Sequence, residues 1–388
     1  MVKLGVASDT DGESRVAIVP ASVKKLLGAG FEVVVQSSAG TRARFEDATY
    51  QQAGATVGTD ADVHACDVVV SLSPQDPERL RRGAVHVCVA DPFRHPQRVR
   101  AFMQAGVQLL SLDMIPRRLS RAQSMDVNSS QDSLAGYRAV LLGAAHLGKV
   151  IPMMTTSAGT VRPARFVVMG SGVAGLQAIA TARRLGAVVY ASDVRLAAKE
   201  QIESVGGRFI HVDGMEDFED ASGYAKPLTP EFIETVNHAV NEVAADADVV
   251  ITTARIFGRA APITVPAEAI ARYRPGTVVV DMNADAGGNC AVTRAGEIIT
   301  TDNGVIVVGL TNLPGQIADT ASTLFSNNLT QLLVSLMHEG ELRMGPDDPI
   351  LVGPPPGDPL HVPDMGGVLV CQDGALHHAQ ARLAKVIA

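Results

Sequence analysis

Residues 165–195, RFVVMGSGVAGLQAIATARRLGAVVYASDVR, decide the fold of this chain. A short apolar run, Phe166–Met169, predicts a buried strand, and a second run, Val188–Ala191, predicts another. Between them, Leu176–Leu185 has the apolar pattern of a helix. A strand, a glycine-rich turn, a helix and a strand in this order predict a βαβ unit with parallel strands.

Three glycines in G-x-G-x-x-G spacing, Gly170, Gly172 and Gly175, form the turn. Gly170 permits a tight turn, Gly172 lets the backbone approach a pyrophosphate, and Gly175 lets helix and strand pack closely. The N-terminus of the helix adds free N–H groups and the positive end of the helix dipole. We therefore expect a dinucleotide here. A glycine-rich turn that binds nothing is the plain alternative.

An acidic residue follows the second strand of this unit. Asp193 lies 18 residues after Gly175, where a carboxylate accepts hydrogen bonds from the adenosine ribose 2′-OH. The same carboxylate repels a 2′-phosphate, so the sequence predicts NAD(H) as cofactor rather than NADP(H). We expect the neighbouring residues Val173, Val194 and Arg195 to belong to the cofactor-binding set as well, together with Gly223, Tyr224 and Arg255 further along the chain.

The composition excludes several classes of protein. At 388 residues the chain suggests two domains. Its mean hydropathy is +0.16, yet no apolar run approaches the roughly 20 residues that span a bilayer. The first residues lack the apolar core of a signal peptide. The formal charge of -8, without a long basic run, argues against a nucleic-acid partner.

The cysteines indicate a reducing compartment. The four cysteines are widely spaced and form no metal-binding motif, so we predict no metal site. They fit reduced thiols in a cytoplasmic protein. They are Cys66, Cys88, Cys290 and Cys371.

Short strands alternate with helices along the chain, which predicts an α/β fold of two Rossmann-like domains with parallel sheets. In the first domain we expect the strands Val2–Ala7, Phe31–Gln36, Val68–Leu72, Val85–Ala90 and Val107–Leu112. In the second we expect Val167–Met169, Val188–Ala191, Val249–Thr253, Thr277–Asp281 and Val305–Val308. Expected helices include Ala21–Ala29, Val127–Ala145 and Ala318–Met337.

Two of these helices are long and are expected to join the domains. Helix 127–145 crosses into the second domain, and helix 318–337 returns to the first. The first domain is then discontinuous, residues 1–130 plus 313–388, and the dinucleotide-binding domain is residues 131–312, with a cleft between them. Residues 345–367, rich in Pro and Gly, are expected to form an irregular surface segment.

Several long stretches resemble one family, the NAD(H)-binding α subunits of proton-translocating NAD(P) transhydrogenase, which are relatives of alanine dehydrogenase. The resemblance covers about residues 1–343. It implies NAD(H) as cofactor, a homodimer, a membrane subunit and an NADP(H)-binding subunit as partners, and attachment to the membrane only through such a partner. The stretches are Pro116–Val140, Thr155–Arg195, Gly223–Lys226, Thr252–Pro262 and Asp281–Cys290.

One of these stretches matches the family's loop of Arg, Gln and Asp. It maps onto Arg118, Gln123 and Asp126, followed by Ser129, and the resemblance implies a place beside the nicotinamide and its ribose. The spacing alone fits donors and acceptors for a carboxamide. It fits equally a surface region in which Asp126 or Ser129 caps the long helix.

A second stretch matches the family's mobile loop, which folds over bound nucleotide. Gly223 and Tyr224 open this segment, followed by Ala225 and Lys226. A polar, Gly-containing connection is compatible with a lid. An ordinary surface loop would have the same composition.

Hydride transfer between two nicotinamides needs no catalytic histidine, whereas alanine dehydrogenase needs one. The early substrate-binding arginine of that enzyme is matched by Arg15. Ser71 replaces its expected lysine, and its expected histidine is absent near Ala90. His86 lies within a strand and is expected to be a packed strand residue. The alanine dehydrogenase site is therefore mostly dismantled.

Some residues depart from the transhydrogenase pattern and support an alternative. Arg255 replaces a leucine, Phe257 a proline and Asn283 an apolar residue. Asp285 stands where alanine dehydrogenase has a functional aspartate. These changes suggest a small polar substrate and a soluble NAD-dependent dehydrogenase or reductase of an amino, imino or oxo acid. In that alternative, Arg15 anchors the substrate carboxylate and Asp285 handles a proton.

Overall fold

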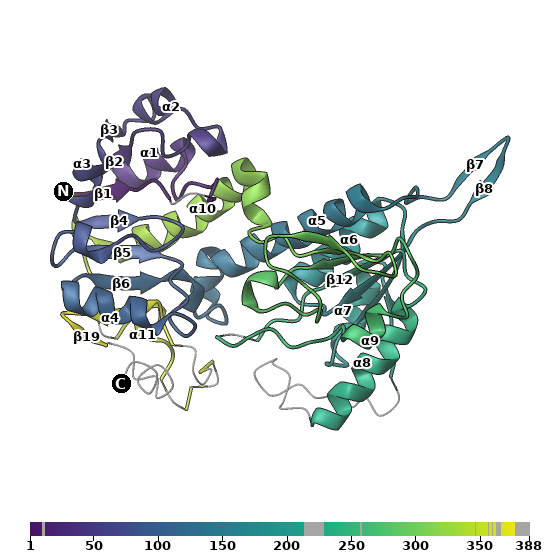
Figure 1. Cartoon of the computed structure of the whole chain (residues 1–388). Helices are drawn as coiled ribbons and strands as arrows, with labels where there is room; N and C mark the ends of the chain where they lie inside the picture. Colours follow the sequence, from purple (N-terminus) through teal and green to yellow (C-terminus); the bar gives the residue numbers. More distant parts are fainter. Residues whose placement is uncertain are drawn as a thin grey trace. The chain divides into compact units, whose positions relative to one another are not determined.

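The structure, a computed structural model, describes residues 1–9, 12–212, 229–256, 258–345, 347–355, 357–358, 360–361 and 366–376. The chain divides into two compact units. Unit 1 comprises Met1–Gln131 and Gly315–Ala388, and unit 2 comprises Asp132–Pro314. Helix α5 (Val127–His146) carries the first boundary. Each unit is an α/β structure built on a mostly parallel sheet (Figure 1), so the predicted fold class is confirmed.

The sheet of unit 1 has eight strands within the described residues, in the order β19-β18-β6-β5-β4-β1-β2-β3. The pairs from β6 to β3 are parallel, and β18 and β19 are antiparallel. The strands are β1 (Val2–Val6), β2 (Phe31–Gln36), β3 (Thr56–Gly58), β4 (Val68–Val70), β5 (Val85–Cys88), β6 (Gln108–Ser111), β18 (Leu369–Gln372) and β19 (Ala375–Leu376). The central strands are rich in valine and buried on both faces, as parallel strands under helices must be.

Helices and 3-10 turns cover both faces of this sheet. The helices are α1 (Pro20–Gly28), α2 (Asp47–Gln52), α3 (Asp60–His64), α4 (Pro96–Ala105), α10 (Ala318–Leu336) and α11 (Pro349–Val352). The 3-10 turns are η1 (Thr41–Ala43), η2 (Pro77–Arg79), η3 (Leu112–Met114), η4 (Ser120–Met125) and η6 (Pro314–Ile317), the last at the unit boundary. A short ladder, β16 (Met337–His338) with β17 (Glu341–Leu342), follows α10.

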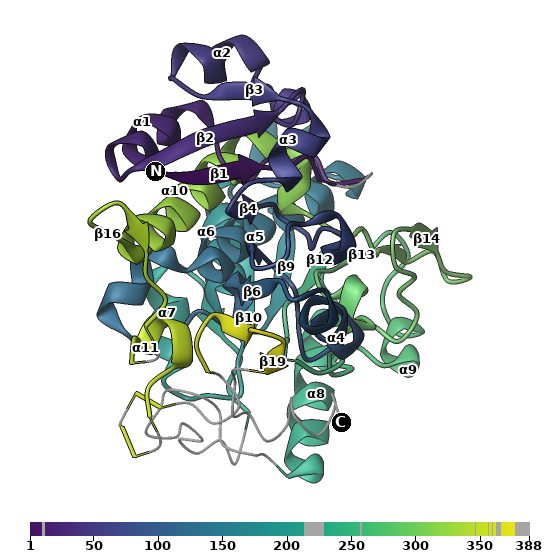
Figure 2. The same cartoon turned by 90° about the vertical axis from the view of Figure 1, so that its left-hand side faces the viewer.

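Helix α10 is built into the core of unit 1, where it lies beside α1 (Figure 2). Phe325 and Leu329 of α10 are at most 1% exposed and belong to the same apolar cluster as the strands. Two buried serines of α10 accept backbone N–H groups, Ser322 from Val16 and Ser326 from Val19, each at 3.0 Å. These bonds satisfy donors that no strand reaches, which is required of buried backbone.

The C-terminal region corrects one expectation. The composition of residues 345–367 predicts irregular surface, but Ile350 and Leu351 of α11 are fully buried, so the prediction is wrong for these residues. Strand β18 then pairs with β6, between β6 and β19, and contacts α4. Prolines and glycines interrupt the short apolar runs of this region and hide their pattern. Strand β18 is regular only because it pairs with the distant strand β6.

Unit 2 contains a seven-stranded sheet among its described residues, in the order β11-β10-β9-β12-β13-β15-β14, parallel except for β14. Its strands are β9 (Arg165–Met169), β10 (Val188–Ser192), β11 (Arg208–Phe209), β12 (Val249–Thr252), β13 (Val278–Asp281), β14 (Ile298–Thr300) and β15 (Ile306–Val308). The helices besides α5 are α6 (Val173–Arg184), α7 (Ala198–Ser204), α8 (Pro230–Ala244) and α9 (Ala267–Ile270), with one 3-10 turn, η5 (Ala284–Ala286).

Alternate residues of the central strands feed two separate cores, which makes unit 2 three-layered. Phe166 and Val168 pack with residues of α5, α6 and α7, and Val167 packs with residues of α8 and α9. Helix α5 approaches closely because Gly136 and Gly143 lack side chains. A Cβ at Gly136 would meet the Ala174 carbonyl oxygen at 2.1 Å.

A hairpin of two short strands, β7 (Met154–Thr156) and β8 (Gly159–Val161), projects from unit 2 (Figure 1). All six strand residues are exposed. The predicted elements do not include this hairpin, since three-residue strands of this kind leave no periodicity. Among the described residues, no helix combines the length and the apolar character that crossing a bilayer requires.

Candidate functional site

The glycine turn between β9 and α6 has the geometry that the sequence predicts. Gly170 has φ +99, a value that favours glycine. A Cβ at Gly175 would lie 2.0 Å from the Gly170 carbonyl oxygen, so helix and turn touch through backbone. Gly172 caps the N-terminus of α6, and a Cβ there would meet nothing within 4 Å. The space in front of Gly172 is therefore open to a ligand.

The turn lies where the strand order of the sheet reverses, between β9 and β12. Open parallel sheets bind ligands at the carboxyl ends of such neighbouring strands. Thr253, directly after β12, joins the two ends, because its hydroxyl donates to the carbonyl oxygens of Met169 (3.1 Å) and Gly170 (3.2 Å). Val173, at the start of α6, is 38% exposed beside this edge.

Asp193 follows β10 and sits against the same turn. Its Oδ2 accepts the Ser171 N–H at 2.9 Å and the Ser171 hydroxyl at 2.7 Å. Its Oδ1 accepts the backbone N–H and the Nε–H of Arg195, each at 3.0 Å. Burial raises the pKa of this carboxyl, but the Arg195 and Ser171 contacts outweigh burial and hold the pKa below its usual value. Asp193 is thus an anion at the end of β10.

A buried polar network forms the other side of this edge. Asp281 is fully buried and accepts the backbone N–H groups of Asn283 (3.0 Å), Asn289 (2.8 Å) and Cys290 (2.9 Å). The amide nitrogens of Asn283 and Asn289 in turn donate to the Ala254 carbonyl oxygen at 3.1 and 2.8 Å. The segment after β12 is therefore fixed by side chains from the segment after β13.

This network holds the side chain of Asn283 inside the segment after β13. Its amide nitrogen also donates to Asn289 Oδ1 at 2.8 Å, and the side chain is buried. Arg255 and Asp285, by contrast, are exposed. Asp281 and Asn289 are absent from the predicted site residues, although both lie in the stretch 281–290 that carries the family resemblance.

The expected lid lies outside the described residues, so its Gly223 and Tyr224 have no described structure. Phe257 also lies outside the described residues.

In unit 1, the loop with Arg118 and Gln123 runs through η4 into α5. Gln123 is exposed, and Arg118 is half-buried. Asp126 is buried and accepts the Ser129 N–H at 3.0 Å and the Ser129 hydroxyl at 2.6 Å. Asp126 thus caps α5, one of the two roles that the spacing left open.

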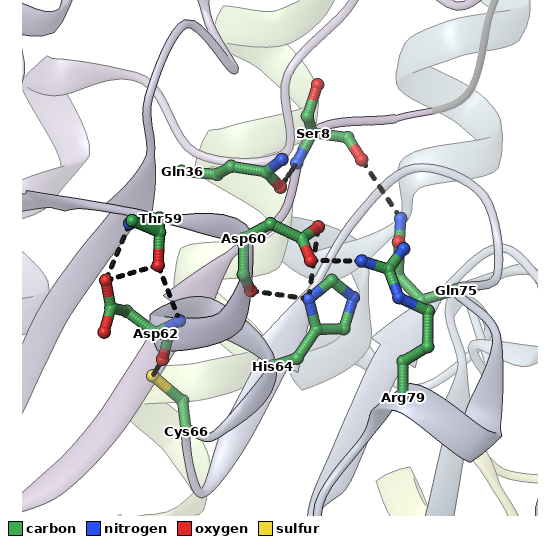
Figure 3. Close-up of polar contacts among 9 residues, drawn as sticks. All are labelled: Ser8, Gln36, Thr59, Asp60, Asp62, His64, Cys66, Gln75 and Arg79. Carbon is green, nitrogen blue, oxygen red and sulfur yellow. Dashed lines mark hydrogen bonds and ion pairs between the residues drawn. The ribbon is translucent and has the colours of Figure 1, made fainter.

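The carboxyl edge of the unit 1 sheet also has a reversal of strand order, between β1 and β4, and it is filled by the chain itself. Ser8 donates its N–H to Gln36 and accepts an amide hydrogen of Gln75 (Figure 3). The next residue, Asp9, accepts the backbone N–H groups of Leu72 (2.9 Å) and Ser73 (2.7 Å). Burial raises the pKa of Asp9 to about 6.

His86 lies on β5 and is fully buried, stacked on Phe102 at 5.5 Å between ring centres. One ring nitrogen contacts the Val69 carbonyl oxygen at 3.0 Å, and the other accepts the Gln75 N–H at 3.1 Å. Burial lowers its pKa to about 4. His86 is a neutral packed strand residue, as the sequence predicted.

Arg15 is engaged within unit 1. Its Nε and Nη2 donate to the two carboxylate oxygens of Glu13 at 2.9 and 2.7 Å, and its Nη1 donates to Gln131 Oε1 at 2.8 Å. This bidentate pairing uses the face of the guanidinium that would bind a substrate carboxylate. Glu13 is absent from the predicted site residues, although it lies only two residues before Arg15.

A glycine turn at a reversal of strand order, with an acid after the next strand, defines a dinucleotide-binding protein of the Rossmann type. Residues 6–135 match the family described as "Alanine dehydrogenase/PNT, N-terminal domain", and residues 139–354 match "Alanine dehydrogenase/PNT, C-terminal domain". The chain therefore belongs to the alanine dehydrogenase/PNT family.

Individual relatives point to one branch of this family. The chain is 38% identical to the NAD(P) transhydrogenase subunit alpha of Haemophilus influenzae over 348 residues, which are 88% of this chain and 68% of that subunit. Its structure is similar to that of a transhydrogenase from Sinorhizobium meliloti, with a TM-score of 0.81, 38% identity, and 97% and 99% of the two chains covered. The alanine dehydrogenase of Bacillus subtilis is only 25% identical over 88% of this chain and 87% of its own.

The two glycines of the turn make a matched pair for a test. Gly172→Ala should leave the free energy of unfolding within about 1 kcal/mol of the parent, because the new methyl group enters open space. It should nevertheless abolish NADH binding, since the methyl group occupies the path to a pyrophosphate. Gly175→Ala should cost about 2 kcal/mol or more through its clash with the Gly170 carbonyl. Denaturant unfolding and calorimetric titration with NADH distinguish the two; a Gly172→Ala variant that binds NADH normally would contradict the assignment.

Proposed function

We propose that the chain is the NAD(H)-binding subunit of a transhydrogenase, and that it takes part in hydride transfer between NADH and NADP⁺. The observation that carries the proposal is a contrast between the two units. In unit 2 the glycine turn is open in front of Gly172 and the Asp193 anion stands beside it. In unit 1 the corresponding sheet edge is filled by Asp9. The chain is therefore equipped to hold a dinucleotide. Its sequence identity to a transhydrogenase subunit supports the proposed hydride transfer between nucleotides.

The residues of unit 2 fit NAD(H). The N-terminus of α6 offers backbone N–H groups and its dipole to the pyrophosphate. Asp193 accepts hydrogen bonds from a ribose 2′-OH and excludes a 2′-phosphate by charge. When bound, the dinucleotide supplies the hydride. The protein then has only to hold the reacting ring, orient it and exclude water.

Gln123 and Arg118 are proposed to bind and position the nicotinamide end of the dinucleotide. An amide side chain both donates and accepts, as recognition of a carboxamide requires. Gln123 is exposed at its turn, whereas Asp126 and Ser129 are tied to each other and support the loop by capping α5. The expected lid, which includes Gly223 and Tyr224, is proposed to close over the bound nucleotide.

The dehydrogenase alternative gains no support from the geometry. It requires Arg15 to bind a substrate carboxylate, but Glu13 and Gln131 already hold that guanidinium. Ser71, in the position of the lysine, donates to the Ser73 carbonyl oxygen at 2.5 Å. Arg255 and Asp285 are exposed, and we propose no substrate contact for them.

The proposed assembly follows from this function. One nucleotide must meet another, so an NADP(H)-binding subunit and a membrane subunit are the proposed partners. The proposed location is cytoplasmic, at the membrane only through a partner.

We also propose a homodimer. The hairpin β7–β8 supports it, since Met153 and Met154 are 67% and 42% exposed, and exposed apolar side chains on a projecting element are typical of interaction surfaces. A second copy of the chain is the proposed occupant.

Cofactor selectivity tests the role of Asp193. Asp193→Ala should weaken NADH binding by about 1.5–3 kcal/mol, the range for hydrogen bonds to a charged group, and should narrow the preference for NADH over NADPH. Calorimetric titration with both nucleotides measures this. Equal or tighter binding of NADPH by the parent chain would refute the selectivity.

The choice of function is tested by turnover with and without a partner. The purified chain should bind NADH but oxidise it with no 2-oxo or imino acid, and addition of an NADP(H)-binding transhydrogenase subunit should produce nucleotide-to-nucleotide transfer. Gln123→Ala should slow that transfer by about 100-fold, as expected for a misplaced reacting group, with little change in NADH affinity. Turnover of a small acid by the isolated chain, lost in Asp285→Asn, would instead establish the dehydrogenase.

Sedimentation tests the homodimer. The chain should sediment with about twice the 40.6 kDa mass of one copy, and the double variant Met153→Asp, Met154→Asp should shift it toward the monomer. Ile298→Asp is the matched control, since Ile298 is equally exposed at 43% but lies on β14. A parent mass of 40.6 kDa at every concentration would refute the dimer.

A further inference from the structure

The turn η4, which presents Gln123, is held at three points by elements from the far end of the chain. Ala122 and Met125 are 0% and 3% exposed and pack in the cluster that contains Phe325, Leu329 and Ile350. Two exposed residues of the turn separate these two residues that face the core. Gln123 lies between them, with its side chain exposed.

The first polar contact precedes Gln123 by two residues. Arg121 pairs with the carboxylate of Asp348. That carboxylate is itself fixed, because the same oxygen accepts the Ile350 N–H at 2.9 Å and so caps α11. Ile350 is fully buried, so the residue that pairs with Arg121 is attached to the core of unit 1.

The second polar contact follows Gln123 by one residue. Asn328, on α10, donates its amide N–H to the Ser124 carbonyl oxygen at 2.8 Å. The Oδ1 of Asn328 is buried and has no hydrogen-bond partner among the described residues. A buried acceptor without a partner lowers the free energy of unfolding, so Asn328 does not stabilise helix α10 by itself. Its donor bond to the loop is what the structure gains from it.

We propose that Arg121, Asp348 and Asn328 are positioning residues for hydride transfer, which hold η4 so that Gln123 is presented in one conformation. This inference rests on the proposed role of Gln123. The three residues belong to unit 1 and the glycine turn belongs to unit 2, so we expect their substitution to change the transfer rate and not the affinity for NADH. The C-terminal segment after α10 thereby acquires a function that its irregular sequence does not suggest.

The size of the effect is bounded by the contacts. Arg121 is 57% exposed on its side chain, and a single exposed ion pair or a single hydrogen bond shifts a local equilibrium by about two- to fivefold. Arg121→Gln and Asn328→Ala should therefore each slow transfer by about two- to fivefold, and by about tenfold together. Arg121→Lys should keep most of the transfer rate of the parent chain, because lysine keeps the positive charge that pairs with Asp348.

Four measurements on the full chain with its NADP(H)-binding partner test the inference: the single-turnover transfer rate, NADH affinity, the unfolding midpoint and the rate in a Gln123→Ala background. Arg121→Gln and Asn328→Ala should lower the rate with unchanged affinity and unfolding midpoint, and should add nothing once Gln123 is removed. Asp348→Asn should match Arg121→Gln, because asparagine still caps α11. Arg81→Gln, which breaks the exposed pair with Asp67 in the same unit, is the control and should leave the rate unchanged.

The outcomes separate the two proposals. If Gln123→Ala does not slow transfer, the role of Gln123 is wrong. If Gln123→Ala slows transfer but Arg121→Gln and Asn328→Ala do not, the positioning inference alone is overturned. A loss of rate that persists in the Gln123→Ala background, or that follows a lower unfolding midpoint, would also overturn it.

Discussion

The contact between the backbone of helix α6 and the backbone of the turn before it is the constraint on which the nucleotide site depends. Gly175 approaches the Gly170 carbonyl so closely that no side chain fits, and Gly170 has a backbone conformation that favours glycine. This approach brings the N-terminus of α6 to the carboxyl edge of the sheet. The open space at Gly172 and the position of Asp193 against Ser171 both follow from it.

The two units place different chemistry at equivalent points. Both sheets reverse their strand order beside a central strand, and backbone N–H groups lie at the resulting edge of each. In unit 1 the carboxylate of Asp9 accepts those N–H groups, and Glu13 neutralises Arg15 nearby in sequence. Unit 1 thus fills with its own side chains the kind of sheet edge that unit 2 leaves open at Gly172.

Buried polar side chains fix the loops around both edges. Asp281 accepts backbone N–H groups of the segment after β13. Asn289, which is one of these donors, in turn donates its amide N–H to the Ala254 carbonyl oxygen after β12. In unit 1, α10 does the same for η4 and for the segment of Val16 and Val19. Because buried polar groups are costly when unpaired, such networks give each loop one conformation.

The sequence by itself determined the elements whose signal is local. β2 has the predicted bounds Phe31–Gln36, and the strands, glycine turn and acid of 165–195 lie where the spacing put them, because periodicity and turn chemistry act over a few residues. The tertiary structure alone decided which polar groups meet. The pairing of Asp9 with Leu72, of Glu13 with Arg15, and of Arg121 with Asp348 depends on chain geometry that composition does not encode. For the same reason β18 was not predicted: this four-residue strand is stabilised by its pairing with β6, more than 250 residues earlier in the chain.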